Sequence, residues 1–494
     1  MTRDDDKSLI NSESFQELKK KSLAGMGALF VRQILVKVIF FIGSIVLARI
    51  LAPQVFGIYA IVNFVVTFFS TFGDVGIGAA LIQKKGELGR EELSTTFWLQ
   101  QMLVWLVVAV VVIAAPLALK VYPTLPPVGV WLIRAMAVSF LFSSLKTIPA
   151  ILMERNIDFK RIAWVDITEN LAFQAVAISC AFMGFEAWSF VLAAITRALL
   201  GTVIIYALSP WRPSFHYRFE SVKGLVRFGL PYQGNQLLNF IKDAVTPLFV
   251  GVYAGAAAVG YVNWARNFAF APLVLSESFG RVAFPAFSKL QDDKELLART
   301  IERSIRMMTL AMFPIMGAMM ALAPELIKVI FTDKWIPGLN AFYCFCMSPI
   351  AIGISLPLYS SILALGRSTI LLVMSGWLIL LEWTLGVTFV MMYGFTGAAL
   401  TQLIIVPLFT YVYKMVLARN GINVKILRNV GAQFIVASLV VVVISFLKKF
   451  IIVNLLSVCG LAVISLSLSM VFIWILDKPS VLELKEYLMK SIIK

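Results

Sequence analysis

Charged side chains inside long apolar segments are the residues of this sequence best placed to do chemistry. Arg32 and Lys37 lie in the apolar run 24–51, and Asp74 lies in the next run, 57–83. A charge at membrane depth costs about 2.5–3.5 kcal/mol on insertion scales, so it usually faces a polar interior or a transport pathway. We therefore expect these three residues to line a water-accessible cavity.

Two later runs carry similar polar groups. The run 226–253 has a stripe along one helical face, at i, i+4, i+7 and i+11: Tyr232, Gln236, Asn239 and Asp243. Three further polar residues adjoin this stripe: Gln233, Asn235 and Lys242. The run 258–285 adds four more: Asn263, Arg266, Asn267 and Glu277. The first, second, seventh and eighth runs are therefore the best candidates to line a cavity.

Other intramembrane charges have a structural interpretation beside a functional one. Arg134, Lys146 and Arg197 either face the cavity or extend toward a membrane interface. Asp166 and Glu169 are interpreted as structural, because Arg161 can neutralise one of them. Glu325 and Lys328, three residues apart, are expected to form a local ion pair on one helix.

The composition defines the class of protein to which these residues belong. The chain has 494 residues, of which 60% are hydrophobic and 14% are charged, whereas a soluble domain has about 25% charged residues. A membrane-crossing helix needs about 20 mostly apolar residues. We predict an all-α, polytopic membrane protein with about fourteen such helices: 24–51, 57–83, 97–118, 129–152, 162–184, 187–208, 226–253, 258–285, 304–331, 338–364, 369–391, 394–415, 430–447 and 456–476.

The distribution of Lys and Arg orients this map. Most of them lie in the two tails and in the intervals that follow even-numbered runs, and few lie in the opposite intervals. Positive charge gathers on the cytoplasmic side, so we predict cytoplasmic N- and C-termini. The formal net charge of +16 then marks the cytoplasmic face, beside anionic lipid, and no nucleic acid is expected as a partner.

Several kinds of site are not expected. Cys180, Cys344, Cys346 and Cys459 lie inside apolar runs and are interpreted as packed thiols. His216 is the single histidine, too few ligands for zinc. No nucleotide-binding motif of the form G-x-x-x-x-G-K-[ST] is present, so neither metal nor cofactor is predicted.

The segment 1–21 lacks the apolar core of a cleaved signal peptide, and we expect the first spanning helix to direct insertion.

An internal repeat relates the second and eighth runs. Gly57 matches Gly260 at an offset of 203 residues, and the same offset places Asp74 on Glu277. Transporter folds are commonly built from such repeats, with the binding site between them. We therefore predict a cavity between the two copies, with Asp74, Asp243 and Glu277 as candidates for coupling to an ion.

The amino-acid sequences of five segments resemble those of a known family. The segments are VLARILAPQVFGIYAIV (46–62), FGDVGIGAALIQKK (72–85), RFGLPYQGNQLLNFI (227–241), GYVNWARNFAFAPL (260–273) and FPAFSKLQDD (284–293). They resemble the Wzx-type polysaccharide flippases of the multidrug/oligosaccharidyl-lipid/polysaccharide exporter superfamily, in the branch related to colanic acid exporters. The resemblance implies two six-helix lobes around a central cavity and a trailing helix pair. The implied divisions are 1–23 (tail), 24–208 (first lobe), 209–225 (linker), 226–415 (second lobe), 416–476 (helix pair) and 477–494 (tail).

The resemblance also implies a function. A non-enzymatic transporter of the bacterial inner membrane would move an undecaprenyl-diphosphate-linked oligosaccharide to the outer leaflet, coupled to H⁺ or Na⁺, alongside a polysaccharide polymerase and other assembly proteins. Cationic side chains suit a diphosphate, and here these are Arg32, Lys37, Lys242 and Arg266. Amide side chains suit sugar hydroxyls: Gln233, Asn235, Gln236, Asn239, Asn263 and Asn267.

Alternatives from the same superfamily stay open. One is a multidrug or metabolite antiporter, which usually lacks the last two helices and, for cationic drugs, has an acidic cavity. Another is a flippase for a peptidoglycan-precursor lipid, which shares the architecture. A membrane polymerase or glycosyltransferase would need a large outer loop with catalytic carboxylates, and the longest outer interval, near 120–129, is mainly apolar.

Overall fold

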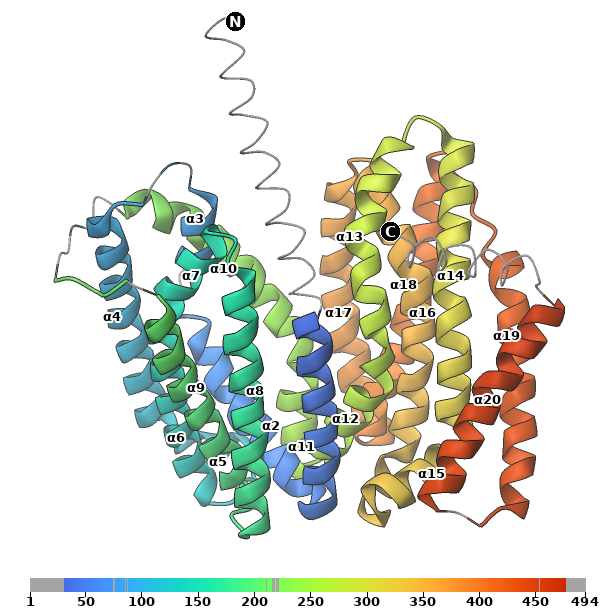
Figure 1. The fold of residues 1–494 in the computed structure, drawn as a ribbon, viewed down its shortest axis with the longest axis horizontal. Helices are drawn as coiled ribbons and strands as arrows, with labels where there is room; N and C mark the ends of the chain where they lie inside the picture. Colours follow the sequence, from blue (N-terminus) through green and yellow to red (C-terminus); the bar gives the residue numbers. More distant parts are fainter. Residues whose placement is uncertain are drawn as a thin grey trace, which may run out of the picture. The chain divides into compact units, whose positions relative to one another are not determined.

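The computed structural model describes residues 31–73, 76–84, 86, 88–209, 211–215, 218, 222–452 and 454–476. The described residues are almost entirely helical and include no β-strand, which confirms the all-α prediction. Contacts divide the chain into two compact units, Met1–Pro247 and Leu248–Lys494. Figure 1 shows the helices of each unit.

The first unit contains the following helices: Val31–Ile50, α2 (Pro53–Ser70), α3 (Ile77–Gln83), α4 (Arg90–Ala114), α5 (Leu117–Val121), α6 (Val128–Leu145), α7 (Thr147–Arg155), α8 (Phe159–Phe182), α9 (Trp188–Leu208) and α10 (Lys223–Asp243). A core cluster that includes Leu81, Phe97 and Ile148 joins α3, α4 and α7. α10, which the sequence assigned to the second lobe, packs here against α3. The predicted lobe boundary at 209–225 stays a prediction.

The second unit contains these helices: α11 (Gly251–Tyr253), α12 (Ala256–Phe270), α13 (Val274–Lys289), α14 (Lys294–Ala321), α15 (Ala323–Leu326), α16 (Leu339–Ala364), α17 (Ser368–Tyr393), α18 (Thr396–Arg419), α19 (Ile426–Leu447) and α20 (Leu455–Leu476). Short π- or 3₁₀-helical segments occur at Val245–Val250, Ala271–Leu273, Ile327–Phe331, Asp333–Gly338 and Lys448–Phe450. α19 and α20 pack together and against α14, around a core that includes Leu310, Val440 and Leu461.

The two units share one pattern of helix packing. In the first unit α2, α4 and α9 contact α6, and α8 contacts α9; in the second, α12, α14 and α18 contact α16, and α17 contacts α18. α2 begins at Pro53 and α12 begins at Ala256, which are 203 residues apart, the offset of the predicted repeat. The second helix of each set is also interrupted, before α3 and before α13. These features support the internal repeat.

Over its described residues, each of the fourteen predicted runs is mainly helical. Among the described residues, eleven helices are long and apolar enough to cross a membrane. The runs 162–184, 226–253 and 258–285 fall outside that set, because charged residues or interruptions divide their apolar stretches. The count of fourteen crossings therefore stays a prediction, while a multi-pass membrane protein is confirmed.

Candidate functional site

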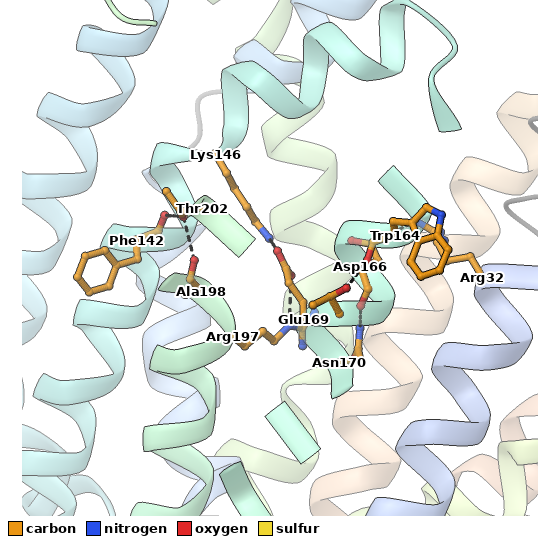
Figure 2. Close-up of polar contacts among 11 residues, drawn as sticks. Arg32, Phe142, Lys146, Trp164, Asp166, Glu169, Asn170, Arg197, Ala198 and Thr202 are labelled. Carbon is orange, nitrogen blue, oxygen red and sulfur yellow. Dashed lines mark hydrogen bonds and ion pairs between the residues drawn. The ribbon is translucent and has the colours of Figure 1, made fainter. Parts of the chain in front are cut away.

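A buried carboxylate in the first unit is shared by two cationic side chains (Figure 2). The Glu169 side chain on α8 is only 2% exposed. Lys146 Nζ donates a hydrogen bond to Oε1 of Glu169, and Arg197 Nε on α9 lies 3.6 Å from Oε2. Three successive long helical segments therefore place their charges at one point. Burial of a carboxylate is costly unless it is paired and hydrogen-bonded, and both cations supply such contacts here.

The break between α6 and α7 positions Lys146. Pro149 has no N–H to donate to the carbonyl of Leu145, four residues earlier, and its ring crowds that carbonyl. The hydroxyl of Tyr206 on α9 donates to the Leu145 carbonyl instead, at 2.9 Å. α6 ends at Leu145 and α7 begins at Thr147, so Lys146 lies at the junction. α9 therefore holds the kink from which the lysine reaches Glu169.

Gly201 provides the space in which the Glu169 carboxylate lies. A Cβ added at position 201 of α9 would overlap Oε1 of Glu169. Beside it, the hydroxyl of Thr202 donates to the carbonyls of Phe142, at 2.7 Å, and Ala198, at 2.8 Å. The close approach of α9 to α6 and α8 therefore depends on a glycine at the point of contact.

A second ion pair involves α8. Arg32 Nη1 lies 2.5 Å from Oδ2 of Asp166, and the side chains point toward each other in Figure 2. The expectation that Arg161 neutralises Asp166 or Glu169 is wrong. Arg161 pairs with Asp158, at 3.3 Å, because residues three apart share a helical face whereas residues five apart do not.

A cavity of about 210 Å³ adjoins the Glu169 cluster. Its polar lining residues come from α2, α6, α8, α9 and the α6–α7 junction: Tyr59, Asn63, Ser139, Ser143, Lys146, Glu169 and Arg197. Its apolar lining consists of Met136, Phe173, Ala194 and Ala198. Lys146 and Arg197 thus border a cavity inside the first unit, and their predicted place in a cavity between the two copies stays a prediction. The cavity lies within one unit of the repeat.

The predicted site residues of α10 have different environments. Gln233 Nε2 donates to the carbonyl of Thr71 at 2.6 Å, and Phe240 stacks on Phe64 at a centroid distance of 5.1 Å, so this face of α10 lies against α2. Lys242 is half-buried, and three residues of the predicted stripe are exposed: Gln236, Asn239 and Asp243. The side chain of Asn235 lies outside the described residues.

The other predicted site residues are distributed over both units. Lys37 is half-buried on the first helix. On α12, Asn263 is half-buried, Asn267 is exposed, and the guanidinium of Arg266 lies 5.7 Å from the ring centroid of Phe270. Asp74 and the side chain of Glu277 lie outside the described residues, so the predicted carboxylate pair stays a prediction.

The remaining predicted pairings of charge are partly corrected. Glu325 accepts a hydrogen bond from Lys448, at 3.1 Å, rather than pairing with Lys328. Lys448 also donates to the carbonyl of Ala321, at 3.0 Å. At the start of α14, Asp293 caps the helix by accepting from Leu296 N at 2.9 Å. Arg134 donates to the carbonyl of Val112 at 3.1 Å and lies over Trp131.

The Glu169 cluster was the main feature that sequence reasoning did not identify as a site. Its signal was available: charges of opposite sign lie inside three consecutive apolar runs, at Lys146, Glu169 and Arg197. Their register across different helices could not be read from sequence, since periodicity relates residues within one helix only.

Comparison with known proteins identifies the family. Residues 46–339 match the family described as "Polysaccharide biosynthesis protein". The chain is 29% identical to the succinoglycan biosynthesis transport protein ExoT of Rhizobium meliloti (strain 1021), over 59% of this chain and 58% of that protein. It is 24% identical to the lipopolysaccharide biosynthesis protein WzxC of Escherichia coli (strain K12), over 71% of each. The chain therefore spans little more than half the length of the first relative.

Solved structures establish the fold. A lipid II flippase MurJ in an inward closed conformation superposes with a TM-score of 0.74 at 15% identity, covering 93% of this chain and 100% of that one. A multidrug resistance MATE family transporter in an inward-facing conformation gives a TM-score of 0.60 at 13% identity, covering 80% and 98%. The predicted resemblance to polysaccharide-biosynthesis membrane proteins is confirmed by the family match and these relatives, and the solved structures show the same fold.

Proposed function

The chain belongs to the polysaccharide biosynthesis protein family, and from this premise we propose that it moves a lipid-linked oligosaccharide across the bacterial inner membrane. The substrate is an oligosaccharide on undecaprenyl diphosphate, carried from the inner to the outer leaflet by alternating access. The observation that carries the proposal is the charge placed inside membrane helices of a chain from this family. An apolar anchor would not need such charges, because they are costly at membrane depth.

The chemistry of the substrate matches the cationic residues. The diphosphate is the group with the greatest cost in lipid, and Arg32, Lys37, Lys242 and Arg266 can neutralise it. Arg binds phosphate through two N–H groups at once, whereas Lys acts as a point charge. The amides of Gln233, Gln236 and Asn263 suit sugar hydroxyls, while the polyprenyl tail stays in lipid.

Coupling to an ion gradient forms part of the proposal. Asp74, Asp243 and Glu277 are the carboxylates assigned to H⁺ or Na⁺ coupling. The proposal includes cytoplasmic N- and C-termini, which the distribution of Lys and Arg supports, and loading of the substrate from the inner leaflet.

A reconstituted transport assay tests the function. Full-length protein in proteoliposomes is given a fluorescent undecaprenyl-diphosphate-linked saccharide, a lipid-linked peptidoglycan precursor or a cationic dye, with and without imposed H⁺ and Na⁺ gradients. We expect translocation of the lipid-linked saccharide, accelerated by one of the two gradients. Preferential transport of the peptidoglycan precursor, or of the dye, would assign the chain to the corresponding alternative within the superfamily.

A further inference from the structure

The connection between α9 and α10 is fastened to the start of α4. Ser94 Oγ and Ser214 Oγ lie 2.7 Å apart, and Trp98 Nε1 donates to the carbonyl of Ser214 at 2.9 Å. The backbone N–H of Arg218 donates to Oγ1 of Thr95 at 3.1 Å. Figure 1 shows this connection beside the upper part of α4. The described part of the connection is therefore attached to the first unit along one polar stretch of α4.

The attachment presents an aromatic side chain outward. The ring of Phe215 stacks on Trp98 at a centroid distance of 5.3 Å, yet Phe215 is 92% exposed. Trp211, four residues earlier, is half-buried and meets the ring of Phe97 edge-on at 5.6 Å. The same connection thus buries one aromatic ring and leaves the other outside. Because transfer of an aromatic side chain from water to an apolar phase is favourable, contact with lipid would stabilise the exposed ring.

The surface of α4 gives the depth of Phe215. The exposed residue at the start of α4 is charged, at Arg90, whereas Met102 and Trp105 are apolar and 62% and 59% exposed. At a rise of 1.5 Å per residue, Trp98 lies about 12 Å from the level of Arg90 and about 6 Å from that of Met102. Aromatic side chains are enriched where water meets the hydrocarbon region. Phe215, stacked on Trp98, therefore lies at the level of that boundary.

Basic side chains flank the exposed ring. Arg212 and Arg218 lie three residues before and three residues after Phe215, and both are exposed. The interval 209–219 contains no Asp or Glu. Basic residues beside exposed aromatic or aliphatic ones are typical of segments that lie in a membrane interface. An anionic membrane surface attracts such residues, and arginine can bind a phosphate through two N–H groups.

We propose that this connection anchors the first unit to the headgroup region of an anionic phospholipid surface. Phe215 and Trp98 lie among the headgroups, and Arg212 and Arg218 contact lipid phosphates. The predicted cytoplasmic position of the interval 209–225 assigns the contact to the inner leaflet. α10, which begins at Lys223, then starts close to a point that is held both by α4 and by lipid.

Accessibility of a spin label measures the depth of Phe215. A nitroxide is attached to Phe215→Cys in full-length protein in which the four native cysteines are alanine, reconstituted in vesicles with phosphatidylglycerol. Met102→Cys provides the lipid-exposed control, and Asp292→Cys, exposed between α13 and α14, provides the water-exposed control. We expect the ratio of oxygen to nickel-chelate collisions at position 215 to exceed that at position 292 clearly. Equal ratios at these two positions would overturn the proposal.

Hydrogen exchange tests the role of the two arginines in the chain with its native cysteines. The peptide that contains Phe215 is followed in nanodiscs of phosphatidylcholine with and without phosphatidylglycerol. We expect phosphatidylglycerol to slow its exchange at least about fivefold, the factor that corresponds to one basic residue near an anionic surface. The double variant Arg212→Gln/Arg218→Gln should lose this effect. Phe215→Ser should exchange faster than wild type in both lipid mixtures.

A matched pair of charge changes controls for the loss of positive charge. Arg299→Gln/Arg303→Gln, on the exposed start of α14, should leave the effect of phosphatidylglycerol on the Phe215 peptide unchanged. The proposal is overturned if phosphatidylglycerol does not slow exchange in wild type, or if Arg212→Gln/Arg218→Gln keeps the wild-type response. Neither measurement involves transport, so either failure leaves the proposed flippase function standing.

Discussion

The hydroxyl of Tyr206 on α9 donates to the carbonyl of Leu145 at 2.9 Å, the carbonyl that Pro149 leaves without a backbone donor. Without Tyr206, the Leu145 carbonyl at the end of α6 would lose this hydrogen-bond donor, and a lost hydrogen bond lowers stability. Lys146 lies at the same junction, between α6 and α7. The hydrogen bond from Tyr206 to Leu145 therefore helps to fix both the break between these helices and the position of the Lys146 charge.

Tyr206→Phe should therefore destabilise the protein by about 0.6–1.7 kcal/mol, the range measured for hydrogen bonds between membrane helices. Unfolding of the purified protein in mixed micelles, followed by circular dichroism, measures this change. Tyr411→Phe, at an exposed tyrosine of α18, is the control and should change stability by less than about 0.5 kcal/mol. Equal effects of the two substitutions would contradict the assigned role of Tyr206.

Gly201→Ala should lower the stability of the protein markedly, although it adds only one methyl group. The added methyl group would overlap the Glu169 carboxylate, so either the carboxylate leaves its cations or α9 moves away from α8. Overpacking of this kind costs about 1–3 kcal/mol. Gly376→Ala on α17, where a Cβ meets nothing within 4 Å, should be neutral or slightly stabilising, because alanine is the better helix former. Comparison of the two unfolding curves checks the prediction.

Exchanging the charges of Arg32 and Asp166 separates folding from transport. Arg32→Asp alone places two carboxylates together, and Asp166→Arg alone places two cations together, so each should lower expression and stability. The double exchange restores an ion pair and should recover stability. We expect transport by the exchanged protein to stay low, because the cation has moved from the first helix to α8. Full recovery of transport would show that the pair acts in folding only.

Lys448→Met should loosen the attachment of α19 in the second unit. The substitution leaves the Glu325 carboxylate, of which 14% is exposed, without its cation, and removes the bond to the carbonyl of Ala321. Hydrogen bonds that involve a charged group contribute about 1.5–3 kcal/mol. Lys449→Met, at the exposed neighbouring residue, is the matched control. Hydrogen exchange at α19 should rise in the first variant, and a rise of the same size in the second would exclude this explanation.

Lys37→Ala and Arg266→Ala should each abolish export of the polysaccharide while the protein still inserts. The reason is that each change removes one of the four cations proposed to neutralise the diphosphate, and an ion is costly at membrane depth unless it is paired. Surface polysaccharide is measured at matched expression, with Arg367→Ala at the exposed start of α17 as the control. Wild-type export by both variants would refute the role of these cations in binding the substrate.

The sequence predicted the secondary structure well, for a physical reason. Crossing a bilayer demands about 20 apolar residues in one helix, so each of the fourteen predicted runs is mainly helical over its described residues. The repeat could also be found, since the offset between Gly57 and Gly260 is also the offset between the first residues of α2 and α12. The prediction misplaced some helix ends. The run predicted to begin at 97 corresponds to α4, which begins at Arg90, because the helix continues through charged residues beyond its apolar part.

Partner choice was decided by the tertiary structure. Nearness in sequence suggested Arg161 for Asp166 or Glu169, and Lys328 for Glu325, but the structure pairs these carboxylates with Arg32, Lys146 and Arg197, and Lys448. Helical periodicity fixes which residues share a face of one helix. It does not fix the rotation or axial shift of one helix against another, on which the meeting of Lys146, Glu169 and Arg197 depends. The sequence therefore determined a charged, multi-pass membrane protein of this family, and helix packing determined which charges meet.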